Sequence, residues 1–116
     1  MKSWVLRIRK TDKEIFDRIK NAEKTIETRP MNAPDSRKWY GNIKVGDKLV
    51  ILCDGERLDK AVKEARIYKD FEKYLKNEDL ENILGKGITK DEARKIHYSF
   101  GCGRLDRYGI IAIDME

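Results

Sequence analysis

The chain has 116 residues, the usual size of a single domain and enough to bury one core. Charged residues make up 41% of it, but aliphatic runs are present and only two prolines occur, so the composition excludes a disordered protein. No apolar run approaches the roughly 20 residues that span a bilayer, and no signal peptide opens the chain. We therefore expect a soluble, cytoplasmic protein that does not enter membranes.

The N-terminal segment predicts a strand followed by a helix. Trp4, Leu6 and Ile8 alternate with polar or exposed positions, which is typical of a strand with one buried face. Thr11 and Glu14 then have the spacing of a capping box, followed by apolar residues at helical intervals.

The next segment, from Lys24 to Arg29, places three charged side chains in a run that favours a strand through its threonines and isoleucine. Alternate residues of a strand share a face, so Glu27 and Arg29 are predicted to be neighbours, with Lys24 at the strand entrance. An acid, a guanidinium and an amine on one patch suit an anionic or amide-bearing ligand. The alternative is a solvated set of ion pairs, each contributing about 0–1 kcal/mol.

A long loop is expected over residues 31–46, with a short helical turn capped by Ser36. Its aromatic and cationic run is a candidate for stacking on the bases of a single strand, where each stacked base contributes about 1–3 kcal/mol. This run consists of Arg37, Lys38, Trp39 and Tyr40. The alternative is that Trp39 anchors the loop on the core.

The middle of the chain predicts one clear strand and one ambiguous segment. A turn at residues 45–47 leads into the apolar strand 49–52. Residues 57–68 have the spacing and composition of a helix when the residues are considered alone.

The last third predicts helices and a closing strand. Asp70 is placed to cap one helix, and Thr89 with Glu92 forms a capping box for another. A glycine-rich segment at 101–103 is expected to be a hinge before the closing strand at 108–113.

Residues 22–29 resemble the GxKxxExR signature of the ASCH family, a branch of the PUA-like barrels. Lys24, Glu27 and Arg29 occupy the charged positions of that motif, whereas Ala22 stands where the family usually has glycine. The order of the other predicted elements is similar to that of the family. The resemblance implies a strand, rather than a helix, within residues 57–68, and we predict that strand from about Ala61. The resemblance implies an α+β fold: a small PUA-like mixed β-barrel decorated by about three to four α-helices, in one domain spanning residues 1–116.

The resemblance also implies a function, namely RNA or nucleotide binding in a cationic cleft beside the motif. Some small members of the family hydrolyse the acetyl amide of N-acetylated cytidine with a lysine, a threonine and a glutamate. Lys24 matches the lysine, but the threonine aligns with Glu27, so Thr25 and Thr28 are each displaced. If the chain is an enzyme, Lys24 and Glu27 are its expected catalytic residues.

Two candidates exist for the distal glutamate of such an enzyme, Glu78 and Glu81. A ribonuclease is a less favoured enzymatic alternative. A protein-interaction domain of RNA metabolism or transcription is a third alternative, although the sequence identifies no particular protein partner.

The charge is distributed unevenly. The chain carries a net +5, but residues 1–46 hold 12 Lys and Arg against 6 Asp and Glu, whereas residues 47–116 hold 14 against 15. The positive half contains the motif, which favours a polyanionic partner such as RNA. Arg104 and Arg107 form a second, weaker basic group near the closing strand.

Cysteine and histidine are scarce. Two cysteines and one histidine, far apart in the sequence, do not fit a zinc pattern, so we expect no metal and no cofactor. Cys53 is predicted to be buried, Cys102 to lie in an exposed loop, and His97 to be a packing or surface residue.

Overall fold

The computed structural model describes the course of the chain from residue 1 to residue 116, and the side chains of residues 1–99 and 103–116. The described chain contains five strands, four α-helices and two short 3-10 helices. In chain order they are β1 (Ser3–Arg7), η1 (Lys10–Asp12), α1 (Lys13–Lys20), β2 (Ile26–Pro30), η2 (Tyr40–Asn42), β3 (Lys48–Cys53), β4 (Glu56–Tyr68), α2 (Phe71–Asn77), α3 (Leu80–Leu84), α4 (Lys90–Tyr108) and β5 (Ile110–Met115).

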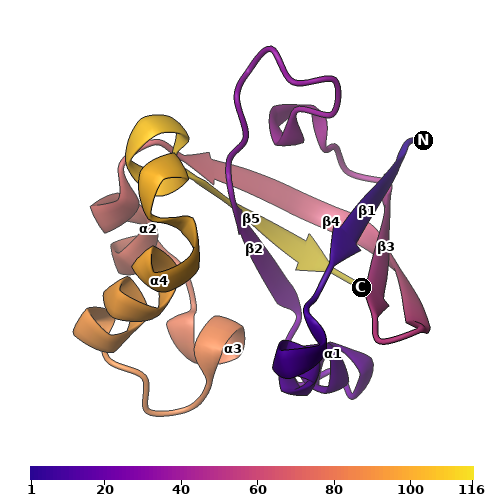
Figure 1. The fold of residues 1–116 in the computed structure, drawn as a ribbon, viewed down its shortest axis with the longest axis horizontal. Helices are drawn as coiled ribbons and strands as arrows, with labels where there is room; N and C mark the ends of the chain where they lie inside the picture. The colour runs from indigo at the N-terminus through magenta and orange to yellow at the C-terminus, as the bar shows by residue number, and fades with distance from the viewer.

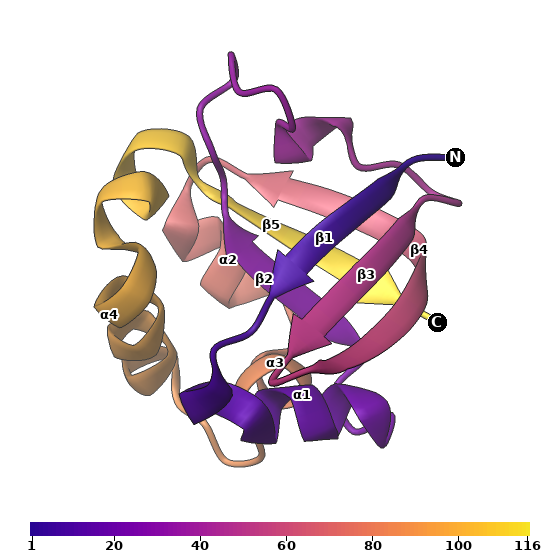
Figure 2. The same ribbon diagram turned by 45° about the vertical axis from the view of Figure 1, so that its right-hand side comes forward.

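The strands form one mixed sheet in the order β1-β3-β4-β5-β2. β1 runs parallel to β3, and every other neighbouring pair is antiparallel. The sheet curls into a half-barrel, which brings its two edge strands, β1 and β2, round toward one another (Figure 2). The predicted class, an α+β fold consistent with a small PUA-like barrel decorated by helices, is confirmed.

β5 is buried on both faces, which explains its uninterrupted apolar sequence. Ile111 and Ile113 face the interior of the curled sheet, where they belong to the same apolar cluster as Trp4 from β1. Ile110 and Ala112 face outward and pack in a second cluster with residues of α2, α3 and α4. The sheet is therefore the middle layer between its own interior and a group of helices.

Helices α2, α3 and α4 gather on one side of the half-barrel, while α1 lies at one end of it (Figure 1). Local capping signals set the starts of two of them. The Asp70 side chain accepts a hydrogen bond from the Glu72 backbone N–H, and Thr89 with Glu92 forms a complete capping box at the start of α4. Both predicted caps are confirmed.

Two other predicted caps are wrong. α1 begins at Lys13 after a 3-10 turn, with Asp12 at its N-cap position and no side-chain cap, so Thr11 and Glu14 do not form a capping box. The short helix in the long loop is η2, which begins at Tyr40 without a side-chain cap from Ser36.

The strand prediction for residues 57–68 is confirmed in type, but β4 begins at Glu56 rather than near Ala61. A tight hairpin explains the earlier start: Asp54 and Gly55 both have positive φ, as a type I′ turn requires, and they join β3 directly to β4. Likewise, the motif strand is shorter than predicted, since β2 begins at Ile26.

The predicted glycine hinge at 101–103 is wrong, because α4 continues from Lys90 to Tyr108. The turn into β5 occurs at Gly109 instead, whose φ is 88° and whose backbone packs closely against Tyr68. Cys53 is buried as predicted, whereas the predicted exposure of Cys102 concerns a side chain outside the described residues. In the described part of the chain, no helix combines the length and apolar character needed to cross a membrane.

Candidate functional site

A pocket of about 330 Å³ lies where the two edge strands of the half-barrel approach each other. Its volume is at the lower end of the range of small-molecule sites, about 300–1,000 Å³. Six elements or their flanking segments contribute to its wall, namely β1, η1, α1, β2, α3 and α4. The lining residues are Arg7, Ile8, Arg9, Asp12, Ile15, Lys24, Glu27, Thr28, Arg29, Ile83, Leu84 and His97.

Lys24 is the buried cation of this pocket, with a side chain only 3% exposed. Its Nζ donates to the backbone oxygen of Ile26 at 2.7 Å and to that of Ile83 at 2.9 Å, and it lies 3.8 Å from Glu27 Oε1. Burial lowers the pKa of Lys24, and the Glu27 carboxylate opposes that effect. The ammonium is thus held more closely by two carbonyl oxygens than by the carboxylate.

Glu27 is the buried acid of the pocket. Its Oε1 accepts a hydrogen bond from the Thr28 backbone N–H at 2.9 Å, and its Oε2 lies 3.4 Å from the Arg29 guanidinium. The prediction that Glu27 and Arg29 are neighbours on the motif strand is confirmed. The Lys24 ammonium and the Arg29 guanidinium therefore lie beside different oxygens of the same Glu27 carboxylate.

Arginines give the pocket a positive mouth. Arg7 and Arg9 are exposed, and the side chain of Arg29 is 23% exposed. Arg9 also forms an ion pair with Asp12 at 2.8 Å. The lining residues include four cationic side chains and two acidic ones, so the pocket attracts anions.

The deep wall contributed by α4 is uncharged at neutral pH. His97 is buried, and its Nε2 lies 2.9 Å from the Tyr74 hydroxyl. Burial lowers the pKa of His97 to about 4, and the nearby Lys24 ammonium acts in the same direction. Burial also raises the pKa of Tyr74. His97 is thus a packed residue, as predicted, which also lines the pocket.

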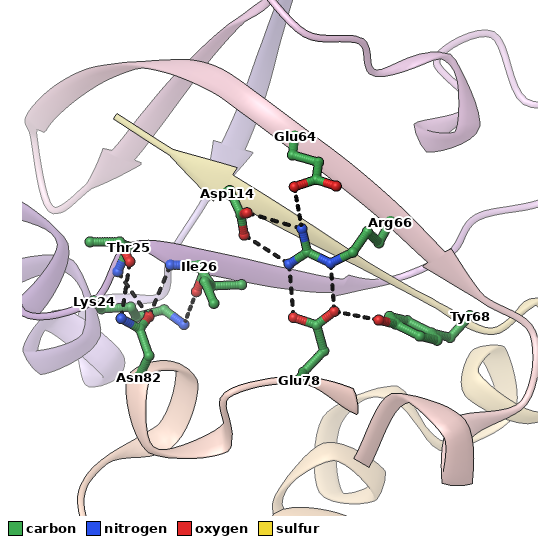
Figure 3. Close-up of polar contacts among 9 residues, drawn as sticks. All are labelled: Lys24, Thr25, Ile26, Glu64, Arg66, Tyr68, Glu78, Asn82 and Asp114. Atoms are coloured by element: carbon green, nitrogen blue, oxygen red, sulfur yellow. Dashed lines mark hydrogen bonds and ion pairs between the residues drawn. The ribbon is translucent and has the colours of Figure 1, made fainter. Parts of the chain in front are cut away.

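Asn82 holds α3 against the start of the motif strand (Figure 3). Its Oδ1 accepts hydrogen bonds from the backbone N–H groups of Thr25 and Ile26, and its Nδ2 donates to the Thr25 hydroxyl at 3.0 Å. Together with the bond from Lys24 to the Ile83 oxygen, these contacts fix the wall formed by Ile83. Of the two candidate threonines, Thr28 lines the pocket and Thr25 is bound to Asn82.

The backbone before the motif strand accounts for the glycine of the GxKxxExR pattern. Ala22, which stands at that position, has a φ of 61°, in the left-handed region that glycine enters freely. The turn has the conformation that the pattern's glycine favours, although this chain places alanine there.

The predicted stacking run lies apart from the pocket. Trp39 and Tyr40 are half-buried and pack against the interior cluster of the sheet, and the Tyr40 ring meets the Trp4 ring edge-on. Lys38 donates to the Ser3 backbone oxygen at 2.9 Å and lies 4.6 Å from the centre of the Trp4 ring. These contacts are those of a loop anchor.

Lys38 and Arg37 nevertheless remain exposed, and together with Lys2 and Ser3 they line a shallow basic depression. Arg104 and Arg107 are exposed on α4. Arg104 lies near the backbone oxygens at the end of β2, and neither arginine lines the pocket.

The two candidate distal glutamates also lie outside the pocket lining. Glu78 binds the Arg66 guanidinium through both oxygens and accepts a hydrogen bond from the Tyr68 hydroxyl (Figure 3). Glu81 accepts a hydrogen bond from the Gly87 backbone N–H at 2.8 Å. Both carboxylates therefore have structural partners.

Sequence reasoning missed the parts of the pocket that come from outside the motif. Arg7 and Arg9 have the spacing of ordinary outward-facing residues, and His97 was predicted to be a packing or surface residue. The curl of the sheet and the packing of α4 bring these residues to the motif. Among the described residues, no group of three or more His, Cys, Asp or Glu is arranged to hold a metal ion.

Two solved structures are similar to the chain over nearly its whole length. The crystal structure of hypothetical protein PH0355 matches with a TM-score of 0.74 and 30% sequence identity, covering 98% of this chain and 97% of that one. The solution NMR structure of protein PF0455 from Pyrococcus furiosus matches with a TM-score of 0.68 and 29% identity, covering 98% and 96%. No family model matches the chain, and no curated protein does.

Proposed function

This chain belongs to the family of hypothetical protein PH0355, and we propose that it is an RNA- or nucleotide-binding domain of the PUA-like ASCH type. The observation that carries the proposal is the buried Lys24–Glu27 pair, with half-buried Arg29 beside it, in a pocket with an arginine-rich mouth. The left-handed backbone at Ala22 supports the ASCH resemblance independently of the charged residues. The proposal includes the cytoplasmic location expected from the sequence.

The pocket offers a nucleotide two chemically different regions. Exposed Arg7 and Arg9, with Arg29, present guanidinium groups that suit phosphate oxygens. Deeper in the pocket, Ile83 and Leu84 give apolar surface for the faces of a base. A phosphate at the mouth and a base inside use both regions, whereas a phosphate inside would meet the buried Glu27 carboxylate.

β1 connects this pocket to the basic depression. Ser3 and Arg7 are the ends of β1, and they line the depression and the pocket respectively. A strand rises about 3.3 Å per residue, so the two ends are separated by roughly 13 Å. A short single strand with its base in the pocket therefore reaches Arg37 and Lys38 with neighbouring phosphates.

Arg29→Ala is expected to weaken RNA binding by about ten- to a hundredfold, because one charged hydrogen bond contributes about 1.5–3 kcal/mol. Wild type and variant are each titrated with a short single-stranded RNA at several salt concentrations, and binding is monitored through amide NMR shifts. Shifts are expected around residues 24–29, and the salt dependence should become shallower by about one released counterion.

Arg57→Ala is the matched control, since Arg57 is exposed on β4 and does not line the pocket. Its RNA affinity should follow that of the wild type, apart from a small general loss of positive charge. Equal weakening by both variants would indicate nonspecific attraction, and undiminished binding by Arg29→Ala would remove the proposed pocket from RNA binding.

One observation favours a second function, hydrolysis of the acyl amide of an N-acylated cytidine. Burial lowers the pKa of Lys24, and a lysine that loses its proton more readily is better suited to proton transfer beside a bound amide. The test incubates the protein with N-acetylated cytidine and measures the release of cytidine and acetate by chromatography. Turnover by the wild-type protein would establish this function, and absence of turnover in the wild type would exclude this substrate.

A further inference from the structure

Glu27 places a carboxylate among pocket residues that are mostly cationic. A ligand that binds beside this carboxylate must offer it hydrogen-bond donors, so Glu27 determines which bases fit the pocket. Resting on the proposed function, we propose that the pocket prefers guanine, and that Glu27 recognises the ring N–H and the exocyclic amino group of that base. The argument uses the hydrogen-bonding capacity of Glu27 and the position of Arg29.

The carboxylate of Glu27 is oriented by the protein but not saturated. Each carboxylate oxygen accepts about two hydrogen bonds. Oε1 takes one short bond, from the Thr28 backbone N–H at 2.9 Å, with Lys24 at 3.8 Å. Among the residues whose side chains are described, Oε2 has only the long contact with Arg29, at 3.4 Å. Both oxygens therefore retain acceptor capacity on a side chain that lines the pocket.

Two acceptor oxygens side by side match two adjacent N–H donors. Guanine is the one standard RNA base that presents such a pair on its pairing edge. Adenine and cytosine place a ring nitrogen lone pair beside their amino group, so one carboxylate oxygen would face another acceptor. Uracil has one ring N–H between two carbonyl oxygens. A site whose buried polar group is left unpaired by the wrong ligand discriminates strongly.

Arg29 completes the match. The carbonyl oxygen of guanine lies next to its ring N–H, so a base bound to Glu27 brings that oxygen toward a neighbouring donor. The Arg29 guanidinium contacts Glu27 Oε2 through Nη2 at 3.4 Å, and its other N–H groups supply further donors beside that oxygen. The donors and acceptors of the pair thus follow the order of the guanine edge.

The test compares GMP, IMP, AMP, CMP and UMP by calorimetric titration into the wild-type protein at one salt concentration. GMP should bind most tightly. IMP differs from GMP only by the missing amino group, so it should bind roughly tenfold more weakly, the loss of one hydrogen bond to a charged group. Comparing these two ligands needs no variant and cannot be confused with misfolding.

Glu27→Gln provides the second measurement, because glutamine keeps one acceptor oxygen and the shape of the side chain. The variant should bind GMP at least roughly tenfold more weakly than the wild type, because its amide NH2 group would face an N–H donor of the base, and amide NMR shows whether it remains folded. Equal binding of all five nucleotides, or a preference for another base, would overturn the guanine assignment and leave the pocket as a nucleotide site. Absence of binding by every nucleotide would overturn the assignment together with the nucleotide-binding proposal.

Discussion

Replacement of Lys24 by methionine is expected to lower the free energy of unfolding by about 3–5 kcal/mol, the usual cost of removing one partner from a buried ion pair. The Lys24 ammonium supplies hydrogen bonds to the backbone oxygens of Ile26 and Ile83 and is the nearest buried cation to Glu27. Methionine fills a similar volume but donates no hydrogen bond, so three acceptors lose a partner in the interior.

Urea unfolding of two further variants tests this explanation. The double variant Lys24→Met/Glu27→Gln should be more stable than Lys24→Met, because it removes the carboxylate that the single change leaves uncompensated. Lys20→Met is the matched surface control. Lys20 contacts Glu56 at 3.3 Å with its side chain 53% exposed, and its loss should cost about 0–1 kcal/mol.

The outcome also separates two roles for Lys24. A large loss that the double variant partly restores identifies a fixed structural cation that shapes the pocket and orients Glu27. A loss no greater than that of Lys20→Met would contradict this role. It would mean that Lys24 makes no essential contact in the free protein and is available for proton transfer.

Local signals in the sequence predicted those parts of the fold that neighbouring residues determine. The Asp70 cap and the Thr89–Glu92 capping box depend on residues two or three positions apart, and both are present. The Thr11–Glu14 box failed although its spacing is identical, because a 3-10 turn precedes α1 and places Asp12 at the N-cap position. The spacing of such a box is therefore necessary for a cap but does not establish one.

The glycine signals show the same limit. Glycine in a helix interior costs about 0.5–1 kcal/mol relative to alanine, so a cluster at 101–103 favours a break. α4 continues through it, and the chain turns at Gly109, where positive φ and close approach to Tyr68 leave no room for a side chain. Glycine propensity therefore predicted the end of the helix at residues 101–103 instead of at Gly109. The contact between Gly109 and β4, which requires glycine, cannot be recognised in the sequence.

The candidate site was predicted only where it lies within the motif. Strand alternation correctly paired Glu27 with Arg29, since that relation is local. Arg7 and His97 reach the same pocket from β1 and α4, and their positions depend on the curl of the sheet and on helix packing. No spacing rule joins residues so far apart in the chain.

Replacement of Arg66 by methionine is expected to destabilise the protein by about 3 kcal/mol, because Arg66 is the shared partner of two carboxylates that strand pairing and α2 bring together. Its guanidinium makes two bonds to Glu78, at 2.7 and 2.8 Å, and two to Asp114, at 3.0 and 2.8 Å (Figure 3). The Glu78 side chain is only 3% exposed. The exposed Glu64 carboxylate also lies 3.2 Å from Arg66, so removing the cation leaves three carboxylates without their common partner at β4, β5 and the end of α2.

Arg57→Met is the control on the same strand, since Arg57 makes an exposed pair with Asp59 and should cost about 0–1 kcal/mol. Arg66→Lys should not restore stability, because an ammonium cannot make four bonds in the plane of two carboxylates. The comparison is made by urea unfolding at several pH values.

The pH dependence of the stability difference tests whether the charge of Arg66 causes the destabilisation. Arg66 lowers the pKa of Asp114, so the wild type gains stability above the ordinary carboxyl pKa of about 4 and loses that gain as the pH falls through the lowered value. The difference between wild type and Arg66→Met should therefore shrink on acidification. A difference that stays constant from neutral to strongly acidic pH would mean that lost packing of the arginine side chain, rather than its charge, causes the destabilisation.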